Sequence, residues 1–155
     1  MLKPILLVED NPNDLDLALR ALAKTNLANE VVTVRDGEEA LDYLHCRGAF
    51  AGRVKGNPAV VLLDLKLPKV SGIEVLQHVR QDKELRSLPV VMLTSSNEET
   101  DLTRSYELGV NAYVVKPVRF KDFMEAVQEL GLFWAVLNEP PPGSLRADVQ
   151  RRELR

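Results

Sequence analysis

The chain has 155 residues, of which 45% are hydrophobic, so it is long enough for one globular domain and is not disordered by composition. Its formal net charge is only −3, with both signs spread along the chain, which gives no electrostatic reason to expect nucleic acid or a membrane as a partner. The single cysteine, Cys46, excludes an internal disulfide, and no apolar run suits a signal peptide or a membrane span. We therefore expect a cytoplasmic protein.

Short apolar runs alternate five times with segments of helical periodicity. The first run, 4–8, predicts a buried strand, and Asn11-Pro12 after it is a favourable cap and first residue for a helix. The later strands are expected at 31–34, 59–64, 89–94 and 112–115, and the later helices after Asp36, after Ser71, from Glu98 to Leu108 before Gly109, and near Arg119. This alternation predicts an α/β fold, with a doubly wound five-stranded parallel sheet and five helices.

The last helical segment is longer than the sheet requires. One apolar stripe continues along it at spacings of three and four residues, through Phe123, Val127, Leu130, Trp134 and Leu137. A proline-rich break and a charged tail follow. We expect the folded domain to span 1–138 and the break and tail to span 139–155.

The outer part of this stripe is expected to form an interface. Phe133, Trp134 and Leu137 lie beyond the expected end of the sheet, where no core remains to cover them. We predict a symmetric homodimer through the fourth helix, fifth strand and fifth helix. The alternative is that the proline-rich segment folds back and covers these side chains.

Polar side chains follow the apolar runs where the strands are expected to end. Glu9 and Asp10 follow the first strand and Asp64 the third, whereas Thr94 ends the fourth strand and Lys116 follows the fifth. The carboxyl ends of parallel strands meet at one edge of a sheet, where ligands bind. Clustered carboxylates repel one another unless a cation bridges them, and oxygen ligands favour Mg²⁺. With the lysine and the threonine, they predict a phosphoryl site that contains an aspartate nucleophile.

Each of these residues also has an ordinary structural interpretation. Glu9 and Asp10 are suitable solvated residues ahead of a capped helix, and an aspartate such as Asp64 at a strand end is commonly a loop or cap residue. A hydroxyl in the position of Thr94 is often structural, and Lys116 before proline fits a turn. Their occurrence together at the ends of four strands favours the phosphoryl site over these separate structural roles.

These residues resemble the receiver domain of two-component response regulators. The resemblance covers about 3–131 and rests on four motifs: VEDN at 8–11, LLDLKLPKVSG at 62–72, MLTSS at 92–96 and AYVVKP at 112–117. It implies a flavodoxin-like receiver fold. It also implies a signalling protein, not an enzyme, that accepts a phosphoryl group from a sensor histidine kinase. The long connection before the third strand and the long fifth helix are similar to those of the single-domain regulators that accompany bacterial phytochrome histidine kinases, which implies a bacteriophytochrome as the kinase. Only about two dozen residues follow the receiver, too few for a DNA-binding module, so we expect output through protein contact or phosphorelay.

The resemblance assigns the acceptor and the metal ligands. It implies that Asp64 is the phosphoacceptor and that Mg²⁺ is held by Glu9, Asp10, Asp64 and the main-chain carbonyl of Lys66. Asparagine is common at position 66 in this family. The lysine side chain therefore either extends into solvent or reaches the mouth of the site and alters the phosphoryl lifetime.

The resemblance also assigns the residues that respond to phosphorylation. Thr94 is implied to move toward the phosphoryl group, Lys116 to pair with a phosphoryl oxygen, and Tyr113 to be the aromatic switch. A cis peptide is implied between Lys116 and Pro117.

Two functions of other classes remain as alternatives. One is a degenerate receiver that binds partners without phosphorylation, against which the complete set of site residues argues. The other is an aspartyl phosphohydrolase of the haloacid dehalogenase kind. Such an enzyme needs a second aspartate two residues after the first, where this chain has Lys66.

Overall fold

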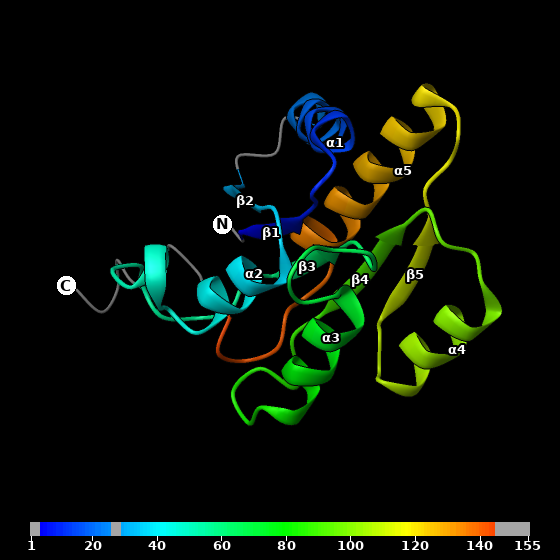
Figure 1. Ribbon diagram of the computed structural model, residues 1–155. Coiled ribbons are helices and arrows are strands. Elements are labelled where there is room, and N and C mark those ends of the chain that lie inside the picture. Colours follow the sequence, from blue (N-terminus) through cyan, green and yellow to red (C-terminus); the bar gives the residue numbers. More distant parts are fainter. Residues whose placement is uncertain (1–3, 26–28, 145–155) are drawn as a thin grey trace.

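Five strands form a parallel sheet, as predicted, and the structure shows their order to be β2-β1-β3-β4-β5 (Figure 1). The computed structural model describes residues 4–25 and 29–144, so the expected tail beyond 144 lies outside the described residues. The strands are β1 Ile5–Val8, β2 Val31–Val34, β3 Val60–Leu63, β4 Val90–Thr94 and β5 Ala112–Val115. The helices are α1 Pro12–Lys24, α2 Gly37–Leu44, α3 Gly72–Gln81, α4 Glu99–Glu107 and α5 Phe120–Gly131, with a short 3₁₀ turn, η1, at Gly48–Phe50.

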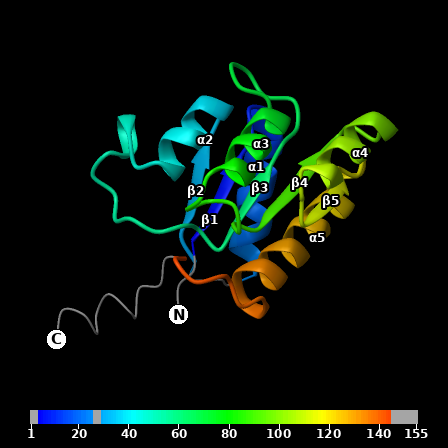
Figure 2. The same cartoon turned by 90° about the horizontal axis from the view of Figure 1, so that it is seen from below.

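Side chains of each strand alternate between two apolar cores, one on each face of the sheet. Leu6 and Val8 of β1 pack into the core under α2 and α3, whereas Ile5 and Leu7 pack into the core under α1 and α5. Figures 1 and 2 show α1 and α5 on one face and α2, α3 and α4 on the other. Burial on both faces explains why the strands are continuous apolar runs.

The helix boundaries follow the capping residues that the sequence predicts. The side chains of Asn11, Asp36 and Ser71 accept main-chain N–H groups in the first turns of α1, α2 and α3. Gly109, with φ of 81°, follows α4 in the left-handed region that glycine adopts without strain. These caps place the start of α1 and α3 directly beside the carboxyl ends of β1 and β3.

Helix α5 continues into a turn of π-helix, η2 Leu132–Leu137, which changes the predicted apolar stripe. Phe133 and Leu137 are 49% and 68% exposed, but Trp134 is half-buried against the core under α1 and α5, and Ala135 is buried. The expectation that no core remains here was therefore wrong for Trp134. A π turn winds more residues per turn than an α-helix, which shifts the side chains around the axis relative to the regular spacing.

The proline-rich segment folds back along the connection that precedes β3. Pro140 is buried, and the N–H of Asn57 donates to the carbonyl oxygen of Gly143 at 3.0 Å. Figure 2 shows this segment, in orange, returning from η2 beneath the sheet. It leaves Phe133 and Leu137 exposed, so the proposed covering of these two residues does not occur within the described chain.

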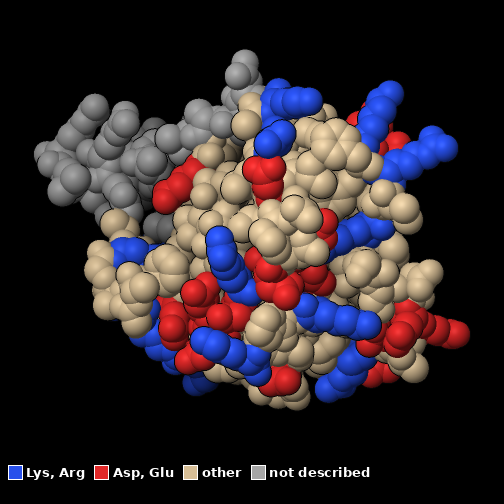
Figure 3. Space-filling view, turned by 45° about the horizontal axis from the view of Figure 1, so that its top comes forward, with Lys and Arg blue, Asp and Glu red and all other residues tan. Residues whose placement is uncertain are grey.

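The surface of the protein carries charges of both signs. Figure 3 shows basic and acidic side chains intermixed on the face that it presents, in keeping with the net charge of −3. Among the described helices, none is both long enough and apolar enough to span a bilayer.

Candidate functional site

The predicted polar residues meet at the carboxyl edge of the sheet, where the strand order reverses between β1 and β3. Val8 is level with Leu63 in the β1–β3 register, so Glu9 and Asp64 leave the sheet side by side. The Asp64 N–H donates to the Val8 carbonyl oxygen at 3.1 Å, which continues the ladder into the site. Ligands of doubly wound sheets bind at such a switch point.

Three carboxylates gather here, as the sequence predicts. Glu9, Asp10 and Asp64 each offer an oxygen, and these oxygens lie within 4.8 Å of one another. Glu9 is 3% and Asp64 7% exposed, whereas Asp10 is exposed to solvent. An all-oxygen set with two buried acids and one open side fits a hard divalent cation that keeps some of its waters.

Lys116 is the positive charge of the site. Its buried ammonium donates to a carboxylate oxygen of Glu9, to Asp64 Oδ2 at 2.8 Å and to Asp14 Oδ2 at 2.9 Å. Asp14 was missed in the sequence analysis. Its position in the first turn of α1, three residues after the cap Asn11, was the available signal, because that turn faces the end of β1.

Burial and charge shift two ionisation equilibria in this cluster. Burial raises the pKa of Glu9 to about 7 in spite of the hydrogen bond from Lys116, and the charge of Asp64 adds to the rise. Burial alone would lower the pKa of Lys116, but hydrogen bonds to Asp64, Glu9 and Asp14 raise it above its ordinary value. The carboxylates outnumber the ammonium, so the cluster retains negative charge for a cation.

Glu9 predicts a pH-dependent stability in the absence of divalent cations. Its folded-state pKa of about 7 lies above the ordinary 4.5, so between these values the folded protein holds a proton that the unfolded chain has lost. The contribution of Glu9 to stability is therefore greatest below pH 4.5 and falls as the pH rises through about 7. Urea unfolding with a chelator, at a series of pH values, should show a flatter dependence for Glu9→Gln. An unchanged slope would contradict the shift.

Thr94 and Tyr113 are linked through the residues that follow β4. Thr94 is fully buried, and its hydroxyl accepts the Ser96 N–H at 3.3 Å. The Tyr113 hydroxyl donates to the carbonyl oxygen of Ser96 at 2.8 Å, and burial raises its pKa. The Ser96 hydroxyl in turn donates to Asp101 of α4 at 2.6 Å. Ser96 thus connects the two predicted switch residues to α4, a role that the sequence analysis missed.

The sequence analysis made predictions for Lys66 and for the peptide bond between Lys116 and Pro117. The Lys66 side chain is exposed, which agrees with both interpretations of it, and its main-chain N–H donates to Asp64 Oδ1 at 3.4 Å. The expected cis peptide between Lys116 and Pro117 was wrong: no peptide bond among the described residues is cis. Trans is the more stable isomer of an X–Pro bond, so this arrangement has no intrinsic cost.

The loop after Asp64 requires a glycine at the start of α3. The Gly72 N–H donates to the Leu65 carbonyl oxygen at 2.8 Å. A Cβ atom at position 72 would lie 2.2 Å from the Asp64 carbonyl oxygen and 2.8 Å from the Leu65 Cα. Both neighbours are main-chain atoms, so the loop would have to move.

Gly72→Ala should therefore destabilise the protein by about 1–3 kcal/mol, the usual cost of overpacking. Urea unfolding measures the loss. Gly52→Ala is the matched control, because a Cβ atom there meets nothing within 4 Å. Equal stabilities of the two variants would show that the loop accommodates the methyl group.

Comparison with known proteins matches one family. The model of the response regulator receiver domain matches residues 5–128. The response regulator Rcp1 of Synechocystis sp. is 40% identical over 132 residues, which cover 85% of this chain and 88% of Rcp1. The crystal structure of the Mn(2+)-bound form of Rcp1 aligns with a TM-score of 0.84 at 39% identity, over 90% of this chain and 99% of that one.

Two other solved structures are similar over the same extent. The bacteriophytochrome response regulator AtBRR is 68% identical with a TM-score of 0.72, over 90% of this chain and 99% of that one. The phosphorylated cyanobacterial phytochrome response regulator RcpA is 41% identical with a TM-score of 0.85, over 91% of this chain and 99% of that one. The residues matched by the family model include every side chain of the carboxylate cluster.

Proposed function

The chain belongs to the family of response regulator receiver domains, and on that premise we propose that Asp64 is the residue that accepts a phosphoryl group from a sensor histidine kinase. One observation carries this assignment: the Asp64 carboxylate is buried at the switch point, 2.8 Å from the Lys116 ammonium and grouped with Glu9 and Asp10. The phosphorylated structure of the similar regulator RcpA supports an acceptor role.

The transfer is a displacement at phosphorus. An oxygen of Asp64 attacks the phosphorus atom of the kinase phosphohistidine, a P–O bond forms, and the P–N bond breaks with its electrons left on the imidazole. The Lys116 ammonium neutralises charge on the transferring oxygens without a proton transfer. A bound divalent cation supplies further charge neutralisation on these oxygens.

We assign the cation as Mg²⁺. Glu9, Asp10, Asp64 and the main-chain carbonyl of Lys66 are its proposed protein ligands. The hard oxygen donors of the cluster suit Mg²⁺, which binds carboxylate and carbonyl oxygens and keeps several of its waters. The Mn(2+)-bound form of Rcp1 supports a divalent cation in this kind of protein.

The product of the reaction is a change of conformation, and the domain is a signalling element and not an enzyme that turns over a substrate. In the unphosphorylated structure the Thr94 hydroxyl accepts a hydrogen bond from the Ser96 N–H. The phosphoryl dianion draws this hydroxyl away from Ser96 and toward itself. That movement disturbs the loop in which the Ser96 carbonyl oxygen accepts a hydrogen bond from the Tyr113 hydroxyl, and so changes the surface that α4, β5 and α5 form. The switch is a two-state element that a local charge biases.

The kinase is proposed to be a bacteriophytochrome, and the exchange is proposed to occur in the cytoplasm, where the kinase meets ATP. The support is similarity to AtBRR, a bacteriophytochrome response regulator, over 90% of this chain. The test is phosphoryl transfer from a panel of autophosphorylated histidine kinases with Mg²⁺ present. Faster transfer from kinases without a phytochrome sensor would contradict the pairing but leave Asp64 as the acceptor.

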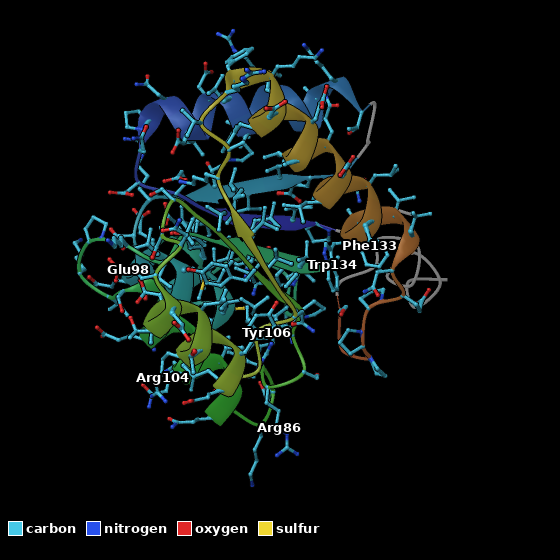
Figure 4. All side chains as sticks on the ribbon, turned by 90° about the vertical axis from the view of Figure 1, so that its right-hand side faces the viewer. Arg86, Glu98, Arg104, Tyr106, Phe133 and Trp134 are labelled. Atoms are coloured by element: carbon cyan, nitrogen blue, oxygen red, sulfur yellow. The ribbon has the colours of Figure 1, made fainter. Side chains whose placement is uncertain are left out.

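We also propose that the protein forms a symmetric dimer through the α4–β5–α5 face, defined here by α4, β5, α5 and η2. Figure 4 shows this face, with Tyr106 on α4 and with Phe133 and Trp134 on η2, beyond the end of α5. The exposed apolar side chains on these elements are Leu102, Tyr106, Val115, Phe120, Leu132, Phe133, Val136 and Leu137. Large exposed apolar side chains in this number favour an interface.

Leu137→Glu should weaken self-association by about tenfold or more, since it places a charge in the proposed interface. Leu137 suits this test better than half-buried Trp134, whose replacement would disturb the core. Analytical ultracentrifugation at a protein concentration of roughly tens of micromolar measures the effect, because a dimer of moderate affinity is partly dissociated near its Kd. Val54→Glu is the control, because Val54 is also exposed and apolar but lies outside the face. A monomeric wild type, or equal association of both variants, would exclude this interface.

A further inference from the structure

A second cluster of metal-ligating side chains lies apart from the carboxylate site. His45 directly follows α2, His78 lies on α3, and Asp82 directly follows α3. Their donor atoms lie within 4.8 Å of one another. The Nε2 atoms of the two histidines are 2.8 Å apart, and His45 Nε2 is 3.9 Å from Asp82 Oδ2. Nothing in the proposed phosphoryl transfer uses these residues.

The fold holds the three side chains in place. His78 lies in the last turn of α3, Asp82 is the residue that caps the C-terminal end of this helix, and α3 packs beside α2. The Glu84 N–H donates to Asp82 Oδ1 at 2.8 Å, so the other carboxylate oxygen, Oδ2, remains for His45. Regular elements and a hydrogen-bonded carboxylate are typical supports of a metal site.

The cluster lies at the opposite edge of the sheet from Asp64. Helices of a doubly wound fold run against the strands, so the C-terminal ends of α2 and α3 lie near the start of the strands. Helix C-termini carry partial negative charge, which favours a cation. The two sites are therefore separate, and occupancy of one does not require the other.

The donor set selects a different cation from that of the carboxylate site. Two imidazoles with one carboxylate are typical of zinc sites that keep a position for water, and imidazole favours Zn²⁺, Ni²⁺ and Cu²⁺ over Mg²⁺. Two nitrogens bound at about 2.05 Å are about 2.9 Å apart at a right angle and about 3.3 Å apart at a tetrahedral angle. The observed 2.8 Å is a hydrogen bond between the two imidazoles, so the nitrogens already lie side by side, and a bound ion would replace this hydrogen bond and move them slightly apart.

We propose that His45, His78 and Asp82 bind a transition-metal cation of the zinc class. The half-buried His45 also lines an open pocket of about 550 Å³, together with Cys46, Lys83 and Glu84, which gives solvent a route to the cluster. A bound ion joins the end of α2 to the end of α3 and stabilises the folded state by mass action.

Zinc titration of the tag-free full chain tests the proposal. Saturating Mg²⁺ is kept present so that the carboxylate site is occupied. Calorimetry should detect one equivalent of Zn²⁺. The chain has two histidines, so NMR should show both sets of imidazole signals shifting together with the same end point. His78→Ala, at an exposed position, should weaken Zn²⁺ binding by about tenfold or more.

Two control variants and one further ligand variant separate this site from others. Cys46→Ser should bind Zn²⁺ as the wild type does, because Cys46 adjoins His45 in sequence but is not in the cluster. Asp64→Asn should also bind normally. Asp82→Asn should bind more weakly while both imidazole signals still shift. Equal zinc affinity of the wild type and His78→Ala would overturn the proposal, as would loss of binding in Cys46→Ser or in Asp64→Asn.

Discussion

Asp64→Asn should abolish acceptance of a phosphoryl group, from a histidine kinase and from a small phosphodonor alike. A carboxylate oxygen is the proposed nucleophile, and the amide that replaces it is not nucleophilic enough to form an acyl phosphate. The other members of the cluster, Glu9, Asp10 and Lys116, remain in place in this variant. No other described acid shares both the burial of Asp64 and its place at the end of β3.

The same substitution should not destabilise the fold. Lys116 donates to three carboxylates, those of Glu9, Asp14 and Asp64, which repel one another. Removing one negative charge leaves the ammonium with two partners and relieves part of the repulsion. The free energy of unfolding of Asp64→Asn, measured in a chelator, should equal or exceed that of the wild type.

Mass spectrometry of the intact protein, after incubation with phosphodonor and Mg²⁺, measures the acceptance. Asp16→Asn is the matched control, since Asp16 is an exposed acid on α1 and should be labelled normally. Undiminished labelling of Asp64→Asn would refute the assignment. Partner binding without labelling of the wild type would favour the phosphorylation-independent receiver, and turnover of a phosphate ester would favour the hydrolase.

Lys116→Met should remove about 3–5 kcal/mol from the free energy of unfolding in the absence of divalent cations. Methionine keeps the length of the side chain but leaves the buried carboxylates of Glu9 and Asp64 without their cation. Breaking a buried ion pair from one side costs this much because the remaining charge stays desolvated. Mg²⁺ should restore part of the loss, because it binds the folded cluster and not the unfolded chain.

Urea unfolding with a chelator, and then with a series of Mg²⁺ concentrations, tests this expectation. Lys121→Met is the control, because Lys121 is exposed on α5 and should change stability by less than about 0.5 kcal/mol. A Lys116→Met protein as stable as the control would show that the carboxylates are solvated or protonated without the lysine. A loss that Mg²⁺ does not reduce would count against the cation at this site.

Local signals in the sequence were sufficient to predict the strands, the helices and most residues of the carboxylate site. Apolar runs bounded by Asn11, Asp36 and Ser71 predicted strands and capped helices, because burial on both faces and capping depend on neighbouring residues. Parallel strands share one carboxyl edge, so positions in the chain alone predicted that Asp64 and Lys116 meet, and the structure confirms it.

Other features depend on how separate elements pack, and only the tertiary structure decided them. Asp14 reaches Lys116 because α1 starts beside the end of β5, and Trp134 rejoins the core because η2 winds differently from a regular helix. His45 and His78 are 33 residues apart, and no local pattern pairs them. Contacts of this kind depend on the relative position of two elements, which is determined by packing over the whole domain and not by the residues of either one.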